Sequence, residues 1–222
     1  TTSCVYCSVH PHSADILFEE AEALGLRLAA GKVLMDRNAP DGLRDSARSG
    51  YDDSLALIRK WHGRGRLLYA ITPRFAGTSS AEQLAAAGAL WREHPDCLMQ
   101  THIAETEAEV AWIRELFPDR GNYLDVYDHH GLCGRGAVFG HGIWLGHDEL
   151  LRLHAADAAI SHCPTSNFFL GSGIFDMARA TRADRPVRVG LGTDIGAGTS
   201  FSILQTLNEA YKASQLNRHP LS

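Results

Sequence analysis

Three short segments carry residues whose types and spacing suit metal-assisted hydrolysis. In MQTHIAETEAE, His102 closes an apolar run and Glu105 follows three residues later. Further along the chain, FGHGIWL contributes His141 and GLGTD contributes Asp194. Imidazole and carboxylate groups favour a borderline metal such as Zn²⁺ over Mg²⁺ or Ca²⁺, and a nearby carboxylate can also carry a proton. These four residues are therefore candidate metal ligands and acid/base groups.

The elements that must position these residues alternate between two kinds of segment. Apolar and β-branched runs predict strands at residues 2–9, 27–35, 67–72, 97–102, 137–141, 158–162 and 187–192. Between them, helical spacing predicts helices at residues 13–24, 53–61, 81–93, 106–117, 148–156 and 203–216. We expect Ser13 to cap the first of these helices. This alternation is typical of βα units with a parallel sheet.

The alternation of strands and helices is compatible with two parallel architectures, a (β/α)8 TIM-type barrel and a doubly wound sheet. The polar residues at the strand ends favour the barrel. Each expected strand but one ends in such a residue: His10, Arg74, His102, His141, His162 and Asp194. In a closed barrel these ends meet around one site. We therefore expect a barrel, with His102, His141 and Asp194 converging at the carboxyl ends of its strands.

Several other chemistries lack their motifs in this sequence. The run VGLGTDIGAG imitates a dinucleotide-binding fingerprint, but its third glycine position is occupied by Ile195. There is no nucleophile elbow, P-loop, H-E-x-x-H motif or cytidine-deaminase zinc signature. A metal-activated water remains as the nucleophile, since zinc lowers the pKa of a bound water to about 7.

Composition narrows the class of protein further. The 222 residues carry 21 basic and 26 acidic groups, a net charge of −5, so we expect a small-molecule partner rather than nucleic acid or a membrane. Five scattered cysteines do not make a disulfide framework, and no apolar run approaches the length of a membrane span. We expect a single domain over residues 1–222 and a cytoplasmic location. The sequence leaves the oligomeric state open, and a homodimer is compatible with it.

An ordered set of motifs resembles a known family. The order T-H-I-A-E, H-G-I, S-H-C-P-T-S-N-F-F-L-G-S-G and G-L-G-T-D resembles the amidohydrolase superfamily of (β/α)8 metallohydrolases. Within it, the segments TTSCVYCSVHP, GKVLMDRNAP and ITPRFAGTSS resemble the guanine deaminases. The resemblance runs through almost the whole chain. It implies a mononuclear zinc enzyme of purine metabolism that hydrolyses guanine to xanthine and ammonia.

The resemblance also implies roles for individual residues near the metal. His102 and Asp194 would be zinc ligands, and Glu105 would move protons between the attacking water and the purine ring. His141 resembles the family histidine that holds the water at the metal, and a direct contact with the metal stays open. Asp194 would also accept a hydrogen bond from that water.

Other residues match the family's substrate site. Arg74 and Phe75 resemble its purine-recognition pair, in which the guanidinium donates to ring acceptors and the aromatic ring stacks. His162 and Asn167 match the motif and are expected to orient the residues around the site rather than to react.

One family feature is missing. The family's first strand carries an H-x-H pair of metal ligands, whereas His10-Pro11-His12 follows the expected second strand, where we interpret it as a loop. We expect the true pair upstream of Thr1, so that this barrel lacks its first βα unit and its C-terminal end, and we do not expect the 222-residue chain alone to be active. The alternatives are a related amidohydrolase acting on another aminated or halogenated heterocycle, and a catalytically inactive barrel fragment.

Overall fold

The computed structural model describes residues 2–217. The chain folds into two compact units. Unit 1 contains the residues up to Thr101 together with Tyr127–Leu132, and unit 2 contains His102–Val126 and the residues from Cys133 onward. Each unit is described by itself. The single domain expected from the sequence stays a prediction.

Unit 1 is built on parallel strands. Their order is β1 (Thr2–Tyr6), β2 (Arg27–Gly31), β4 (Leu67–Pro73) and β5 (Leu98–Ile103), and the short β3 (Val33–Leu34) pairs with β4. The register places Thr2 beside Arg27, Leu28 beside Leu67 and Ala70 beside Leu98. Because all these pairs are parallel, each strand needs a crossover before the next, as the sequence predicts.

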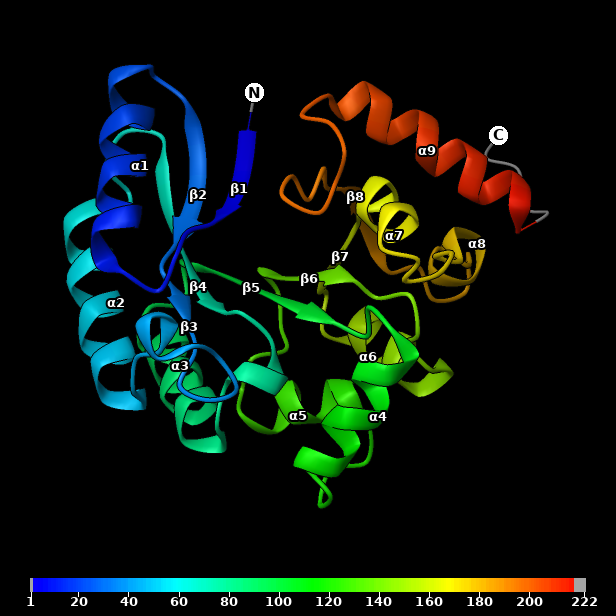
Figure 1. Cartoon of the computed structure of the whole chain (residues 1–222), viewed down its shortest axis with the longest axis horizontal. Coiled ribbons are helices and arrows are strands. Elements are labelled where there is room, and N and C mark those ends of the chain that lie inside the picture. Colours follow the sequence, from blue (N-terminus) through cyan, green and yellow to red (C-terminus); the bar gives the residue numbers. More distant parts are fainter. Residues whose placement is uncertain (1, 218–222) are drawn as a thin grey trace. The chain divides into compact units, whose positions relative to one another are not determined.

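The crossovers of unit 1 are the helices α1 (Pro11–Ala23), α2 (Ala47–Trp61) and α3 (Ala81–Glu93), with single 3-10 turns at η1 (Asp41–Leu43) and η2 (Ala76–Thr78). Helix α1 packs against β2, both α2 and α3 pack against β4, and α2 contacts both other helices (Figure 1). Phe18 of α1 stacks on Trp61 of α2 with ring centroids 5.5 Å apart. This aromatic contact lies in the core between the helices and Tyr69 of β4.

Unit 2 repeats the βα pattern. It begins with the last residues of β5 and continues through β6 (Ala137–His141), β7 (Ala159–His162) and β8 (Arg188–Leu191), which pair in parallel. The helices of this part of the chain are α4 (Glu107–Leu116), α5 (Tyr123–His129, whose last turn belongs to unit 1), α6 (His147–Ala155), α7 (Pro164–Phe169), α8 (Met177–Ala180) and α9 (Ile203–Leu216). The register aligns Gly140 with Ser161 and His162 with Leu191, so the carboxyl ends of β6, β7 and β8 are neighbours.

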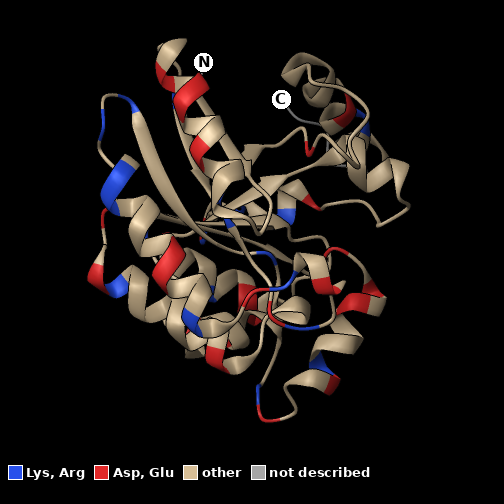
Figure 2. Ribbon diagram, turned by 60° about the vertical axis from the view of Figure 1, so that its left-hand side comes forward, with Lys and Arg blue, Asp and Glu red and all other residues tan. Residues whose placement is uncertain are grey.

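The strands hold almost no charge. Most Lys, Arg, Asp and Glu residues lie on helices and loops (Figure 2). Within the described strands, only the first residues of β2 and β8, Arg27 and Arg188, are charged. Strands β2, β4 and β6 are largely buried, and an unpaired charge is costly in such strands.

The structure corrects several sequence-based boundaries. The strand expected at 27–35 is two strands, because after Gly31 the amide of Val33 donates to Ser8 O. Helix α2 begins at Ala47 rather than Asp53, since Ser46 and Ser49 form a capping box. The short α5, α7 and α8 and the two 3-10 turns were not predicted.

The interpretation of His10-Pro11-His12 as a loop is also wrong in part. Helix α1 begins at Pro11, with His10 at its N-cap position, because proline suits the first turn of a helix. Ser13 is therefore not the cap. Its hydroxyl lies within the first turn, donates to His10 O at 2.7 Å and accepts the Ser8 amide at 3.0 Å.

Gly31 sits where two strands approach too closely for a side chain. A Cβ at this position would lie 1.8 Å from Ala70 O, whereas a Cβ at Gly42 would meet nothing within 4 Å. We expect Gly31→Ala to destabilise the protein by about 2 kcal/mol or more, because the backbone of β4 must shift. Thermal or urea unfolding of both variants tests this, and equal stabilities of Gly31→Ala and Gly42→Ala would contradict it.

Candidate active site

The ends of β5 and β6 place two histidines side by side in unit 2. The amide of Gly142 donates to Ile103 O at 2.9 Å, and that of Trp144 donates to Ala104 O at 3.0 Å. These bonds join the segments that follow His102 and His141. The two imidazole rings stack with centroids 5.4 Å apart.

Asp194 and Glu105 complete a compact group with these histidines. One ligand atom from each of His102, His141 and Asp194 lies within 4.8 Å of the others. Nε2 of His141 is 3.8 Å from Asp194 Oδ2 and 3.7 Å from Glu105 Oε2. The expectation that His102, His141 and Asp194 converge is confirmed.

His141 is held in a fixed orientation. It is 1% exposed, and its Nδ1 donates to Asn167 Oδ1 at 2.9 Å. Because Nδ1 carries the proton in this bond, Nε2 keeps its lone pair for a metal ion or a water. Asn167, itself 1% exposed, comes from α7.

The backbone at the site is strained. His141 has φ 68°, Ala104 has φ 49° and Asp194 has φ 48°, all in the left-handed region that non-glycine residues avoid. Such conformations cost of order 1–3 kcal/mol each and persist where surrounding contacts impose them. These three strained residues lie at or just after the strand ends that carry the site. The surrounding contacts keep the unfavourable backbone conformations, which direct the side chains of His141 and Asp194.

A tight turn holds Asp194 after β8. The amide of Gly198 donates to Asp194 O at 2.6 Å, and the hydroxyl of Thr165 donates to Thr193 O at 3.1 Å. A Cβ on Gly198 would lie 1.9 Å from Thr193 O, so the turn needs glycine there. The glycines that imitate a nucleotide-binding loop in the sequence thus shape the turn that carries Asp194.

Glu105 has a partner that sequence reasoning missed. The hydroxyl of Ser172 donates to Glu105 Oε1 at 2.9 Å, and Ser172 is 4% exposed. Trp144 Nε1 in turn donates to Ser172 O at 2.9 Å. The bond leaves Oε2 of Glu105 facing His141. The only sequence signal is the position of Ser172 between two glycines at the end of the S-H-C-P-T-S-N-F-F-L-G-S-G motif.

His162 is a neutral neighbour of the group. It is 2% exposed and stacks on Phe175 with centroids 4.8 Å apart. Burial, and to a smaller extent His141, lowers the pKa of His162 to about 4. Its Nδ1 is buried and has no hydrogen-bond partner among residues 2–217. An uncharged imidazole with an open nitrogen suits a site that binds a ligand.

These residues fit a zinc ion. Two imidazoles and a carboxylate are a common catalytic ligand set, and tetrahedral ligand atoms about 2 Å from zinc lie about 3.4 Å apart. His141 Nε2 lies 3.8 Å from Asp194 Oδ2, and one ligand atom from each of the three residues lies within 4.8 Å of the others, so small side-chain shifts would bring them to that spacing. The Asn167 bond also supplies the outer hydrogen bond that orients metal-binding histidines.

A second group of possible ligands has a structural explanation. His62, Asp96 and Cys97 lie together in unit 1. However, Nδ1 of His62 accepts the Tyr69 amide at 3.0 Å, and its Nε2 lies 3.1 Å from Asp96 Oδ2. Burial raises the pKa of the Cys97 thiol to about 12. Both imidazole nitrogens are engaged, so this group ties the end of α2 to β4 and to the segment before β5.

The expected substrate-binding residues lie in unit 1, directly after β4. Arg74 is exposed and Phe75 is half-buried, and the guanidinium carbon lies 5.2 Å from the ring centroid. The pair therefore offers an aromatic surface and a planar set of donors together. His10, which was expected at a strand end of unit 1, is an exposed residue at the start of α1 and does not join a ligand group among the described residues.

The fold and the strand-end group together define the class of protein. The model of the amidohydrolase family matches residues 1–220, and the chain belongs to this family. Within the family, it is 53% identical over 222 residues to the guanine deaminase of Escherichia coli (strain K12), covering 100% of this chain and 50% of that relative. The chain thus spans about half the length of the curated relatives it matches.

Solved structures give the same result for the fold. The structure of E. coli guanine deaminase matches with a TM-score of 0.97, covering 100% of this chain and 51% of that one. A crystal structure of guanine deaminase from C. acetobutylicum with bound guanine in the active site matches at 30% identity with a TM-score of 0.94, covering 98% of this chain and 52% of that one. The predicted fold class, parallel βα units of a partial TIM-type barrel, is confirmed. Within residues 2–217, no helix is both long enough and apolar enough to cross a membrane.

Proposed function

We propose that the protein containing this chain catalyses the hydrolytic deamination of guanine to xanthine and ammonia. The observation that carries the proposal is the convergence of His102, His141 and Asp194 beside the carboxylate of Glu105. The 53% identity to the E. coli guanine deaminase supports guanine as the substrate. Cytoplasmic location and a homodimer stay predictions.

His102, His141 and Asp194 are the residues that would hold the metal, which we propose to be zinc. Bound there, zinc would lower the pKa of a water molecule and make it a nucleophile at neutral pH. His141 reaches this position through Nε2, since Nδ1 is engaged by Asn167. Asp194 contributes the negative charge and a second oxygen that can accept a hydrogen bond from the water.

Glu105 is the proposed proton carrier. Its Oε2 faces His141 Nε2 at 3.7 Å, while Ser172 holds Oε1. Glu105 takes a proton from the water that attacks the amino-bearing carbon of guanine and delivers it to the adjacent ring nitrogen. The carbon–nitrogen bond to the amino group then breaks, and ammonia leaves with the second proton of the water.

Arg74 and Phe75 are proposed to bind the purine. A planar guanidinium matches the carbonyl oxygen and ring nitrogens of guanine, and the Phe75 ring can stack on the base. Adenine presents an amino donor where guanine has its carbonyl. Arg74 would lose with adenine the hydrogen bond that the guanine carbonyl accepts, so this pair would discriminate against adenine.

Substitution of Arg74 tests the choice of substrate. We expect Arg74→Met to lower kcat/KM for guanine by at least about tenfold, because a charge-assisted hydrogen bond contributes about 1.5–3 kcal/mol. Turnover of guanine, adenine, cytosine and a triazine is measured for the 222-residue chain and for the full-length protein that includes it.

The matched control is Arg48→Met, which removes an exposed arginine of unit 1 that pairs with Asp52. It should leave guanine turnover unchanged. Zinc content and a melting curve are recorded on the same preparations. Unchanged guanine kinetics in Arg74→Met, or preferred turnover of another heterocycle by the unsubstituted protein, would contradict guanine as the substrate.

A further inference from the structure

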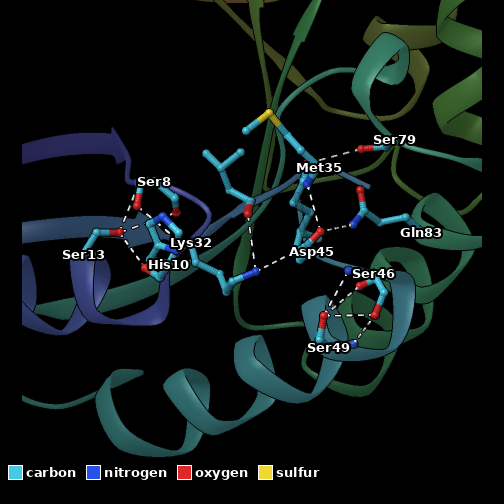
Figure 3. A network of polar contacts seen from close by, with 12 residues as sticks. Ser8, His10, Ser13, Lys32, Met35, Asp45, Ser46, Ser49, Ser79 and Gln83 are labelled. Atoms are coloured by element: carbon cyan, nitrogen blue, oxygen red, sulfur yellow. Dashed lines mark hydrogen bonds and ion pairs between the residues drawn. The ribbon is translucent and has the colours of Figure 1, made fainter. Parts of the chain in front are cut away.

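The loop between β3 and α2 is closed at its base by a buried network (Figure 3). Nζ of Lys32 lies 2.6 Å from Asp45 Oδ2, with side-chain exposures of 0% and 8%. The other carboxylate oxygen of Asp45 accepts the Met35 amide at 3.2 Å and Gln83 Nε2 at 2.6 Å. The Asp45 amide donates back to Met35 O at 2.8 Å. Met35 and Asp45 are thus bonded in both directions, and residues 36–44 extend from a fixed base.

The first three residues of this loop bind the segment that follows Arg74 and Phe75. Arg37 Nη2 donates to Ala76 O at 2.8 Å, and Asn38 Nδ2 donates to Gly77 O at 2.8 Å. The next carbonyl, Thr78 O, accepts the amides of Asp36 at 3.0 Å and of Arg37 at 3.2 Å. Three consecutive carbonyls of one turn are therefore each bound by residues 36–38, which we call the 36–38 clamp.

Asp36 fixes the far end of the same segment. Its Oδ1 accepts the Ser80 amide at 2.7 Å, and its Oδ2 accepts the Ser80 hydroxyl. Ser80 caps helix α3 through the Gln83 amide at 3.1 Å. The clamp is thus tied to a helix terminus, which limits its own movement.

The near end of the segment is fixed by strands. The Arg74 amide donates to Leu34 O at 3.2 Å, and the Thr101 hydroxyl donates to Arg74 O at 3.3 Å. The Ala76 amide donates to the hydroxyl of the buried Tyr127 at 2.9 Å. The backbone on both sides of Phe75 is therefore bonded, and all of these residues belong to unit 1.

We propose that Asp36, Arg37 and Asn38 are positioning residues that set the direction of Arg74 and Phe75 for the substrate. The inference rests on the proposed role of Arg74 and Phe75 in binding guanine. None of the three needs to touch the base, because they act on the backbone carbonyls of residues 76–78. Asn38 has φ 50°, a left-handed conformation that asparagine tolerates better than most residues. This conformation accompanies the bond from its side-chain amide to Gly77 O.

The clamp should affect binding more than chemistry. A loosened turn leaves Arg74 and Phe75 less ordered in the free protein, so that substrate binding must restore their order. The proposed metal ligands and Glu105 are on other segments of the chain, at or after the ends of β5, β6 and β8. Loss of a clamp bond should therefore raise KM for guanine and leave kcat nearly unchanged.

Three variants test the positioning role. Arg37→Ala removes the donor to Ala76 O, and Asn38→Gly removes the donor to Gly77 O while still accepting the left-handed φ. We expect each to raise KM for guanine about 3- to 10-fold, since a hydrogen bond contributes about 0.5–1.5 kcal/mol, with kcat within about twofold. Arg37→Lys keeps a cationic donor and should restore much of the loss.

Arg44→Ala is the matched control. Arg44 lies in the same loop and pairs with the exposed Asp41, without a bond to residues 74–80. It loses the same charge as Arg37→Ala and should leave KM unchanged. An equal rise in KM for Arg44→Ala would overturn the inference, because the effect would then come from the loop as a whole.

Hydrogen exchange separates this inference from the proposed function. Peptides covering residues 74–80 should exchange faster in Arg37→Ala and Asn38→Gly than in Arg44→Ala, whether or not guanine is the substrate. Unchanged exchange, or faster exchange with an unchanged KM, would refute the positioning role. If the unsubstituted protein does not turn over guanine, the proposed function fails and this role fails with it, while exchange still decides whether the clamp orders the turn. A melting curve identifies a misfolded Arg37→Ala, in which case Asn38→Gly decides.

Discussion

Replacing Glu105 by glutamine should lower guanine turnover by about 10²- to 10⁴-fold while zinc content stays unchanged. Glutamine has nearly the same shape and can still accept the hydrogen bond from Ser172, but it cannot take and return a proton. General acid/base groups contribute rate factors of this size. The measurement is kcat for guanine, together with elemental analysis of zinc on the same sample.

Two further variants make this result specific. Glu107→Gln changes an exposed carboxylate in the first turn of α4, two residues away, and should leave turnover unchanged. Ser172→Ala removes the bond to Oε1 and should give a smaller loss than Glu105→Gln, because Glu105 still carries the proton but is less well oriented. Wild-type turnover in Glu105→Gln with zinc bound would remove Glu105 from the proposed role.

Much of the candidate site could be predicted from the sequence, because apolar runs that end in a polar residue indicate where the strands end. The run AVFGH predicts a strand at residues 137–141, and the structure has β6 with these bounds. Thr106 is the N-cap of α4, whose spacing of apolar residues the sequence displays. Once the strands are known to be parallel, their carboxyl ends share an edge, and polar residues there must approach one another.

Contacts between distant segments were not predictable in this way. Ser172 meets Glu105 across 67 positions, and neither residue's local pattern specifies the other. At the break after Gly31, the Val33 amide donates to Ser8 O and Lys32 reaches Asp45, thirteen residues later. The first turn of α2 contains Gly50, whose low helix propensity hides the start that the Ser46 and Ser49 capping box fixes. In each case a tertiary or capping contact outweighs local preference.

The glycine-rich run at the end of β8 shows how one pattern can have two physical explanations. Sequence reasoning rejects it as a nucleotide-binding loop because Ile195 stands where a glycine is required. The structure gives its glycines another use, since Gly198 permits the close turn that holds Asp194 at φ 48°. The turn therefore has a structural role that makes Asp194 available to the histidines.

Asp194→Asn should lower the affinity for zinc by at least about 100-fold and abolish measurable guanine turnover at the same time. Loss of residues that only orient a ligand costs about 10- to 100-fold in metal affinity, so loss of a charged ligand should cost no less. Asparagine tolerates the left-handed φ of this position, which keeps the backbone effect small. The affinity is measured by competition with a zinc chelator, and kcat for guanine is measured in parallel.

Asp157→Asn is the matched control for this change. Asp157 has φ 55°, lies in the same unit and pairs with Arg188 rather than with the histidines. The control thus removes the same negative charge from another aspartate whose backbone is in the left-handed region. It should retain wild-type zinc affinity and turnover. If Asp194→Asn binds zinc as tightly as Asp157→Asn, Asp194 is not a ligand. The close approach of its carboxylate to His141 would then serve only to orient that imidazole, and the metal would have to be held by His102 and His141 with other groups.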